Sequence, residues 1–198
     1  LGDFNKRQVQ EIQNDRVLSI GENIHVRRFV RYATGVCVPY IRMGGKIGVL
    51  VNLEICDCLQ GNPGVIELGK DVAMQIAAMN PTYLDKSDVD PTVLDKEKEI
   101  LMAQAIEENK SAAKPKPEAI IEKMVMGRVG KYYEENCLLQ QAFVKENKVS
   151  VEKHIAEVAK QVGGSIKVTG FIRFATGEGI EKRQDDLAAE VEKLVNNK

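Results

Sequence analysis

The stretch Thr169-Gly-Phe-Ile-Arg-Phe-Ala-Thr-Gly-Glu-Gly-Ile-Glu-Lys182 tells most about the fold. Apolar and polar side chains alternate over residues 166–176, which predicts a strand. One face of this strand would carry Ile166, Val168, Ile172 and Phe174, and the other Lys167, Thr169, Phe171 and Arg173. The glycine and acidic residues that follow predict a turn and then a charged helix over residues 183–198. We expect the strand to complete a sheet that begins earlier in the chain.

Three further extended segments are predicted at residues 24–33, 36–41 and 46–55, with glycine-containing turns between them. In the third segment every odd position from 47 to 55 is apolar, so one face belongs to the core. Residues 65–79 and 151–162 have helical periodicity and can cover that face. The pattern predicts an α+β fold with a three- to four-stranded antiparallel sheet covered by helices.

The chain is predicted to form one domain with a helical insertion. An N-terminal helix lies within residues 1–22, the core within 23–90, and the core is completed by 149–182. Residues 91–148 are rich in charge and contain two helical stretches around a Lys- and Pro-containing connector at 109–117. Each stretch has only a narrow apolar seam, so we expect an antiparallel, coiled-coil-like α-hairpin that projects from the body. The seam positions are Val93, Leu94, Ile100 and Leu101 in the first arm, and Ile121, Met124, Val125, Arg128 and Tyr132 in the second.

Composition excludes several classes of protein. There are 28 Lys and Arg against 29 Asp and Glu among 198 residues, so net charge provides no overall attraction to nucleic acid or to an anionic membrane. No apolar run approaches the roughly 18 to 20 residues that span a bilayer, and no signal-peptide pattern opens the chain, so we expect a soluble protein. Because Leu1 takes the place of an initiator Met, we expect a fragment or a processed form.

The four cysteines are predicted to be reduced thiols of a cytosol-like compartment. They form no CxxC pair, and only His25 and His154 could join them, so the spacing of a zinc site is absent. Cys56 and Cys58 alternate across a strand end and are expected to point to opposite faces.

We find no catalytic constellation, and we expect neither an enzyme nor a cofactor. Gly44-Gly45-Lys46 lacks the first glycine of a phosphate-binding loop, the following Ser or Thr, and a helix, so it predicts a hairpin turn. Glu178 and Glu181 have no basic or nucleophilic partner and are interpreted as a turn and a helix start. His154 is expected to be partly packed on its helix.

Two alternatives of another class remain open. The first is an RNA-binding module that uses a basic and aromatic sheet face. That face would combine His25, Arg27, Phe29 and Arg31 with Lys167, Phe171 and Arg173. The second is a structural oligomerisation unit whose helical hairpin pairs with its own copy. A steep loss of affinity with salt would identify the first, and a concentration-dependent mass the second.

The stretch at 169–182, together with residues 20–28, 44–51 and 71–81, resembles the elongation factor Ts family, and the likeness extends over nearly the whole chain. The resemblance implies a guanine nucleotide exchange factor for elongation factor Tu, without covalent chemistry. It also implies a location in the cytoplasm or in an organellar matrix, with no direct binding of nucleic acid.

The resemblance further implies that this chain is the docking part of such a factor. The family's Thr-Asp-Phe-Val wedge and its N-terminal helical module do not appear in the sequence. In the family, the hairpin turn docks on elongation factor Tu, and here that turn would be formed by Arg42, Met43, Gly44, Gly45 and Lys46. Many members have His where this chain has Arg42. The helical insertion is a second candidate contact, either with the GTPase or with another copy to form a homodimer.

Overall fold

The computed structural model describes residues 8–111 and 117–180. Its helices are α1 (Val9–Ile20), α2 (Pro63–Met79), α3 (Pro91–Lys110), α4 (Glu118–Asn136) and α5 (Val151–Val162). Its strands are β1 (Val36–Arg42), β2 (Ile47–Ile55), β3 (Ala142–Phe143), β4 (Glu146–Ser150) and β5 (Ile166–Ala175). The predicted α+β class is confirmed. The predicted helix over 183–198 lies outside the described residues.

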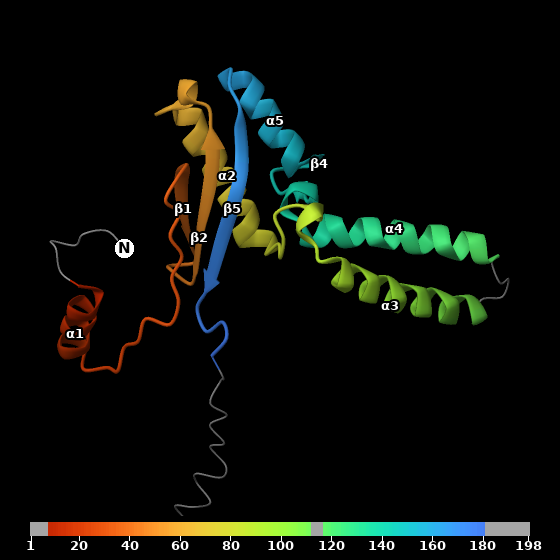
Figure 1. Ribbon diagram of the computed structural model, residues 1–198, viewed down its shortest axis with the longest axis horizontal. Coiled ribbons are helices and arrows are strands. Elements are labelled where there is room, and N and C mark those ends of the chain that lie inside the picture. Colours follow the sequence, from red (N-terminus) through yellow and green to blue (C-terminus); the bar gives the residue numbers. More distant parts are fainter. Residues whose placement is uncertain (1–7, 112–116, 181–198) are drawn as a thin grey trace, which may run out of the picture.

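The main sheet is antiparallel with strand order β1-β2-β5, so β2 is the central strand. Val38 of β1 pairs with Val51 of β2, which pairs in turn with Phe171 of β5. As predicted, the odd positions of β2 form the buried face, where Val51 and Leu53 are fully buried. Helix α2 lies across this face, and α5 lies beside α2 over β5 (Figure 1). The sheet therefore has one helix-covered face.

Helix α2 begins and ends at sites that its flanking sequence specifies. The Asn62 side chain accepts a hydrogen bond of 2.9 Å from the Gly64 backbone, and Pro63 occupies the first helical position. Asn80 ends the helix in a left-handed conformation, directly before Pro81. Gly69 lets α2 approach β1 closely, because a Cβ there would overlap Val38, lying 2.8 Å from its Cβ.

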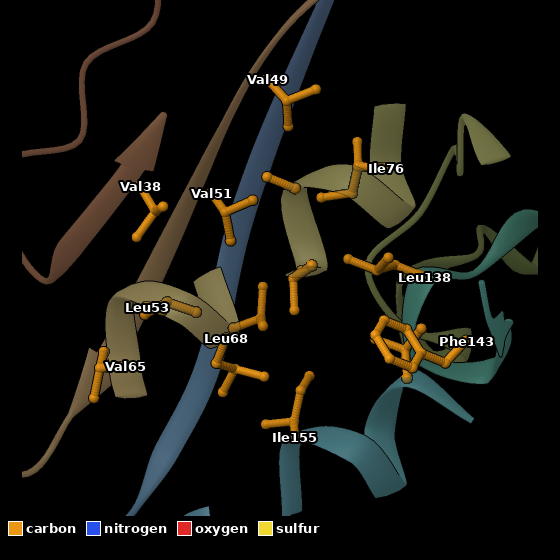
Figure 2. Close-up of a cluster of buried hydrophobic side chains, with 14 of the residues drawn as sticks. Val38, Val49, Val51, Leu53, Val65, Leu68, Ile76, Leu138, Phe143 and Ile155 are labelled. Atoms are coloured by element: carbon orange, nitrogen blue, oxygen red, sulfur yellow. The ribbon is translucent and has the colours of Figure 1, made fainter. Parts of the chain in front are cut away.

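The core fills the space between the sheet and the two covering helices, and Figure 2 shows its side chains converging from both layers. Leu138 and Phe143 enter it from the segment that follows α4, so residues 137–148, predicted from the sequence to be part of the insertion, contribute to the body. The labelled core residues in Figure 2 are Val38, Val49, Val51, Leu53, Val65, Leu68, Ile76, Leu138, Phe143 and Ile155.

Two buried glutamines connect α2 to the segment that follows α4. Gln75 donates to the Gln141 side chain and to the Ala142 carbonyl, both at 3.1 Å, and accepts from the Val144 backbone at 2.8 Å. Gln141 donates to the Glu135 carbonyl at 2.9 Å. Both side chains are fully buried, so these bonds satisfy polar groups that would otherwise be costly.

Helices α3 and α4 lie side by side and extend away from the sheet (Figure 1). Ala105, Ile121 and Val125 are buried between them, and Arg128 pairs with Glu108 at 2.6 Å. Of the first arm's predicted seam, Leu101 packs here, whereas Ile100 is 51% exposed. Residues 112–116, where the predicted hairpin would turn, lie outside the described residues, so the hairpin stays a prediction.

The structure corrects the prediction for residues 24–33, which form no strand. Side chains hold this segment instead of a backbone ladder. Arg27 donates to the Gly179 carbonyl at 2.8 Å, and Arg28 pairs with Glu178 at 3.0 Å. Arg28 also lies over the ring of Phe174, 4.4 Å from its centroid. Contacts with β5 and the turn after it thus explain Arg27 and Arg28, whereas the apolar residues Val26, Phe29 and Val30 are exposed.

A β-bulge in β5 corrects the predicted faces of that strand. The register between β2 and β5 shifts at Asn52 and Leu53, leaving Thr169 without an opposite residue. Asn52 stabilises the bulge by donating to the Thr169 hydroxyl at 2.8 Å. The extra residue reverses the alternation, so Phe171 packs against the core on the same side as Val168. Ile172 and Phe174 face the other side, contrary to the prediction.

The cysteine prediction is wrong for one pair, because Cys56 and Cys58 form a disulfide. Strand β2 ends at Ile55 and a 3₁₀ turn begins at Asp57, so strand alternation no longer applies between the two cysteines. The turn brings their Cα atoms to 5.3 Å, which is within bonding range. Cys37 and Cys137 are free thiols.

Candidate functional site

The turn between β1 and β2 contains all five residues predicted to bind a partner. Arg42 pairs with Ile47 at the end of the ladder, and residues 43–46 form the turn itself. Three consecutive residues have positive φ angles: Met43 at 54°, Gly44 at 63° and Gly45 at 93°. A Cβ at either glycine would meet no atom within 4 Å, so glycine is needed here for its backbone angle and not for space. The prediction of a hairpin turn at Gly44-Gly45-Lys46 is confirmed.

The turn is anchored on both sides. Lys46 donates to the Met43 carbonyl at 3.4 Å, and the Lys46 carbonyl accepts from the backbone and the hydroxyl of Thr176, at 2.8 and 3.1 Å. The antiparallel ladder of β1 and β2 continues directly from it. Met43 is held in a conformation that is unfavourable for a side chain of its size, which the surrounding bonds must offset. The side chains of the turn therefore project from a fixed backbone.

The tip presents cations beside apolar side chains. Arg42 and Lys46 are exposed, and neither has an ion-pair partner in the part of the chain that the structure describes. Met43 is 63% exposed and Ile41 72% exposed. Sequence reasoning missed Ile41, although alternation in β1 places it on the same outward face as Pro39. Such a surface can make both salt bridges and apolar contacts with another protein.

The acidic and histidine residues considered as candidates have structural partners. Glu178 accepts from the Ala175 backbone at 3.1 Å and pairs with Arg28, and these interactions, in that order, lower the pKa of its carboxyl. His154 stacks on Phe143 with ring centroids 4.1 Å apart, and its Nε2 lies 3.6 Å from Asp71. His154 is thus partly packed, as predicted. Glu181 lies outside the described residues.

The basic and aromatic face predicted for RNA binding does not assemble. Residues 24–33 add no strand to the sheet, and Arg27 is engaged by the turn at 178–179. The bulge places Phe171 against the core, while Lys167 pairs with Glu54 in the ladder. The cations and aromatics expected on one face therefore belong to different surfaces, and the structure gives no stacking platform of the predicted kind.

No group of three or more His, Cys, Asp or Glu side chains within residues 8–111 and 117–180 could hold a metal ion. None of the helices within them has the length and apolar character needed to cross a bilayer.

Comparison with known proteins gives a consistent family. The family model described as Elongation factor TS matches residues 2–178. The chain is 46% identical over 194 residues to Elongation factor Ts of Clostridium kluyveri, covering 97% of this chain and 60% of that protein. It is 47% identical over 190 residues to Elongation factor Ts of Clostridium perfringens, covering 95% and 60% respectively. The chain thus spans about three fifths of the length of these relatives. On this match, the chain belongs to the elongation factor Ts family.

Proposed function

We propose that this chain is the docking part of a translation elongation factor Ts, which binds elongation factor Tu and promotes release of GDP. The family match over residues 2–178 supports the assignment. The observation that carries the docking role is the anchored turn at Arg42–Lys46, whose cations and Met43 are exposed and unpaired within the described structure. As proposed, the protein performs no covalent chemistry and needs no cofactor.

Exchange in this proposal is a coupling between two binding equilibria. A protein that binds the nucleotide-free GTPase more tightly than the GDP-bound form must weaken GDP binding by the same factor. The contacts must therefore differ between the two states of the GTPase. The turn provides attachment, and the difference between states has to come from groups that move when GDP leaves.

Release of fluorescent GDP from elongation factor Tu, with and without this chain, tests the docking surface. The double variant Arg42→Ala and Met43→Ala removes a cation and an exposed apolar side chain from the tip. We expect it to weaken binding about tenfold or more, because interface anchors of this kind carry most of the binding energy. The concentration needed for half-maximal stimulation should rise by the same factor.

A matched control is available on α2. Ile66 is 39% exposed and Lys70 is exposed, one helical turn apart and outside the β1–β2 turn. The variant Ile66→Ala and Lys70→Ala should bind and stimulate release as the unmodified chain does. Equal affinity of the tip variant and this control would discard the docking assignment.

A homodimer through the helical arms is a second proposal of ours, and exposed apolar side chains on α3 and α4 favour it. Ile100 of α3 is 51% exposed and Met126 of α4 is 66% exposed, outside the seam that joins the two helices. Sedimentation velocity over a range of concentrations tests the proposal. A mass that rises with concentration supports the dimer, and a constant monomer mass up to about 100 μM would reject it.

The proposed role also implies a place of action. Elongation factor Tu works where proteins are synthesised, so the chain would act in the cytoplasm or in an organellar matrix. The proposal involves neither a membrane nor direct contact with nucleic acid.

A further inference from the structure

The outer edge of β5 has no strand partner among the described residues. The sheet ends at β5, whose only ladder there is with β2. An edge strand presents a row of backbone N–H and C=O groups that can pair with another extended chain. Another chain can pair with this row only if there is space beside the strand.

Two adjoining cavities lie along this edge. One, of about 500 Å³, is lined by residues 166–169, and the other, of about 540 Å³, by residues 169–173. Successive strand residues point to opposite faces of a sheet, so a run of consecutive residues can line one cavity only through the backbone edge. The cavities share Leu84, Asp88 and Thr169, and together they form one groove, which we call the β5 groove.

The opposite wall of the β5 groove comes from residues 80–88 and from the first turns of α5. Leu84, Leu139 and Ile155 supply apolar surface. A free backbone edge and apolar contacts are what the addition of a strand requires. The backbone ladder gives affinity, and alternate side chains of the added strand pack into pockets beside the edge.

The charge of the β5 groove indicates which chain would fit. Four carboxylates line it: Glu178 is paired with Arg28, whereas Asp85, Asp88 and Glu152 have no ion-pair partner in residues 8–111 and 117–180. Lys167 and Arg173 are its two cations. The Arg173 Nε–H is buried beside the groove without an acceptor in the described structure, and a main-chain carbonyl is an acceptor of the kind it lacks.

We propose that the β5 groove binds an extended basic segment of a partner protein, which adds as a fourth strand to the sheet. Positive side chains at alternate positions would meet the three carboxylates that lack an ion-pair partner among the described residues, while the backbone pairs with residues 166–173. A second copy of this chain is a poorer occupant, because its own β5 edge is flanked by residues 80–88 and α5, and these walls hinder the close approach of two such edges. The proposal does not depend on the docking role of the β1–β2 turn, which uses different residues.

A short model peptide tests the proposal on the full chain. The probe is a fluorescein-labelled, N-acetylated and C-amidated Lys-Val-Lys-Val-Lys-Val-Lys, measured by fluorescence anisotropy. A second version carries N-methyl groups on alternate backbone amides, and a third replaces every Lys by Glu. We expect the first to bind, the N-methylated version to bind about tenfold more weakly or worse, and the acidic version not to bind. Amide hydrogen exchange should slow at residues 166–173 when the first peptide is bound.

Substitutions in the β5 groove distinguish binding that depends on its charges from non-specific binding of the peptide. Asp88→Asn with Glu152→Gln should weaken peptide binding about threefold to tenfold. The control Glu146→Gln with Glu157→Gln removes two exposed carboxylates outside the groove and should leave binding unchanged. Both pairs of substitutions preserve shape and hydrogen-bonding capacity, so the fold is expected to survive.

Four results would overturn the proposal. These are equal binding of the basic and N-methylated peptides, equal loss in both pairs of variants, protection that falls outside residues 166–173, and a basic peptide that does not bind. A fifth result would also overturn it. If residues 166–173 become more protected from exchange as the concentration of the chain alone rises, the occupant of the β5 groove is a second copy and not a partner segment.

Discussion

Each cysteine has a chemical environment of its own. Cys56 and Cys58 are joined, Cys37 is exposed, and Cys137 is fully buried. Burial raises the pKa of the Cys137 thiol to about 11, and the nearby Asp85 and Asp88 act in the same direction. Only the thiolate reacts readily with electrophiles, so Cys137 is protected both by its protonation and by its position.

Thiol counting tests this assignment. In native, unreduced protein near pH 7.5, iodoacetamide should modify Cys37 alone. Denaturation without a reductant should expose two thiols, Cys37 and Cys137, and prior reduction should expose all four. Mass spectrometry of the intact protein gives the number of labels. Four labels on denatured protein that was never reduced would show that Cys56 and Cys58 are not joined.

Glu178 predicts a dependence of stability on pH. Its pKa lies below the ordinary value near 4.5, because it accepts from Ala175 and pairs with Arg28. A lowered folded-state pKa contributes stability above the unfolded-state value, and this contribution is lost as the pH falls through the folded-state value. We expect Glu178→Gln to be less stable than the unmodified chain at pH 7, and we expect this difference to shrink as the pH falls through the folded-state pKa of Glu178. Urea unfolding at pH 7 and at a series of lower pH values measures this, and a difference independent of pH would contradict the assignment.

At the scale of elements, substitution by Ala at two helical glycines is expected to change stability in opposite directions, because their surroundings differ. Gly69 of α2 lies against Val38, and a methyl group there has no room. We expect Gly69→Ala to destabilise the fold by about 1 to 3 kcal/mol, since overpacking outweighs the better helix propensity of Ala.

Gly127 of α4 has no atom within 4 Å of an added Cβ, which makes it the matched comparison. Gly127→Ala should stabilise the protein by about 0.5 to 1 kcal/mol, because only the propensity term remains. Thermal or urea unfolding of both variants checks the pair. Equal signs for the two changes would mean that the close approach of α2 to β1 is not as the structure shows it.

Regular elements with strong periodicity could be predicted from the sequence, whereas the bulge in β5 and the lack of a strand at residues 24–33 could not. The apolar odd positions of β2 and the caps Asn62 and Asn80 locate a strand and a helix by local rules. The bulge at Thr169 depends on Asn52, which is more than 100 residues away in sequence, so the reversed faces of β5 leave no local signal. Residues 24–33 have a strand-like composition, but they lack a strand partner in the described structure, and strand formation depends on a partner.

The position of the β1–β2 turn was predictable for a similar reason, whereas its proposed docking role comes from the resemblance to the elongation factor Ts family. A turn with two adjacent glycines allows positive φ angles, and the flanking strands fix where it must lie. Exposure of Ile41 and the absence of ion pairs at Arg42 and Lys46 depend on the rest of the molecule and could be found only from the structure.

At the scale of the whole molecule, the two candidate surfaces lie at different parts of one sheet. The β1–β2 turn lies at the end of a ladder, the β5 groove lies along a strand edge, and α3 and α4 extend away from the body (Figure 1). The packed core beneath the covering helices holds the turn, the groove and the two helices in place.

In the proposed function, this chain docks on elongation factor Tu and favours its nucleotide-free state. Calorimetric titration of the chain into nucleotide-free and into GDP-bound elongation factor Tu tests this proposal. We expect binding to both forms, with a lower Kd for the nucleotide-free form, because that difference is the source of exchange. Equal affinity for the two forms would contradict a role in exchange, and no binding to either would contradict docking itself.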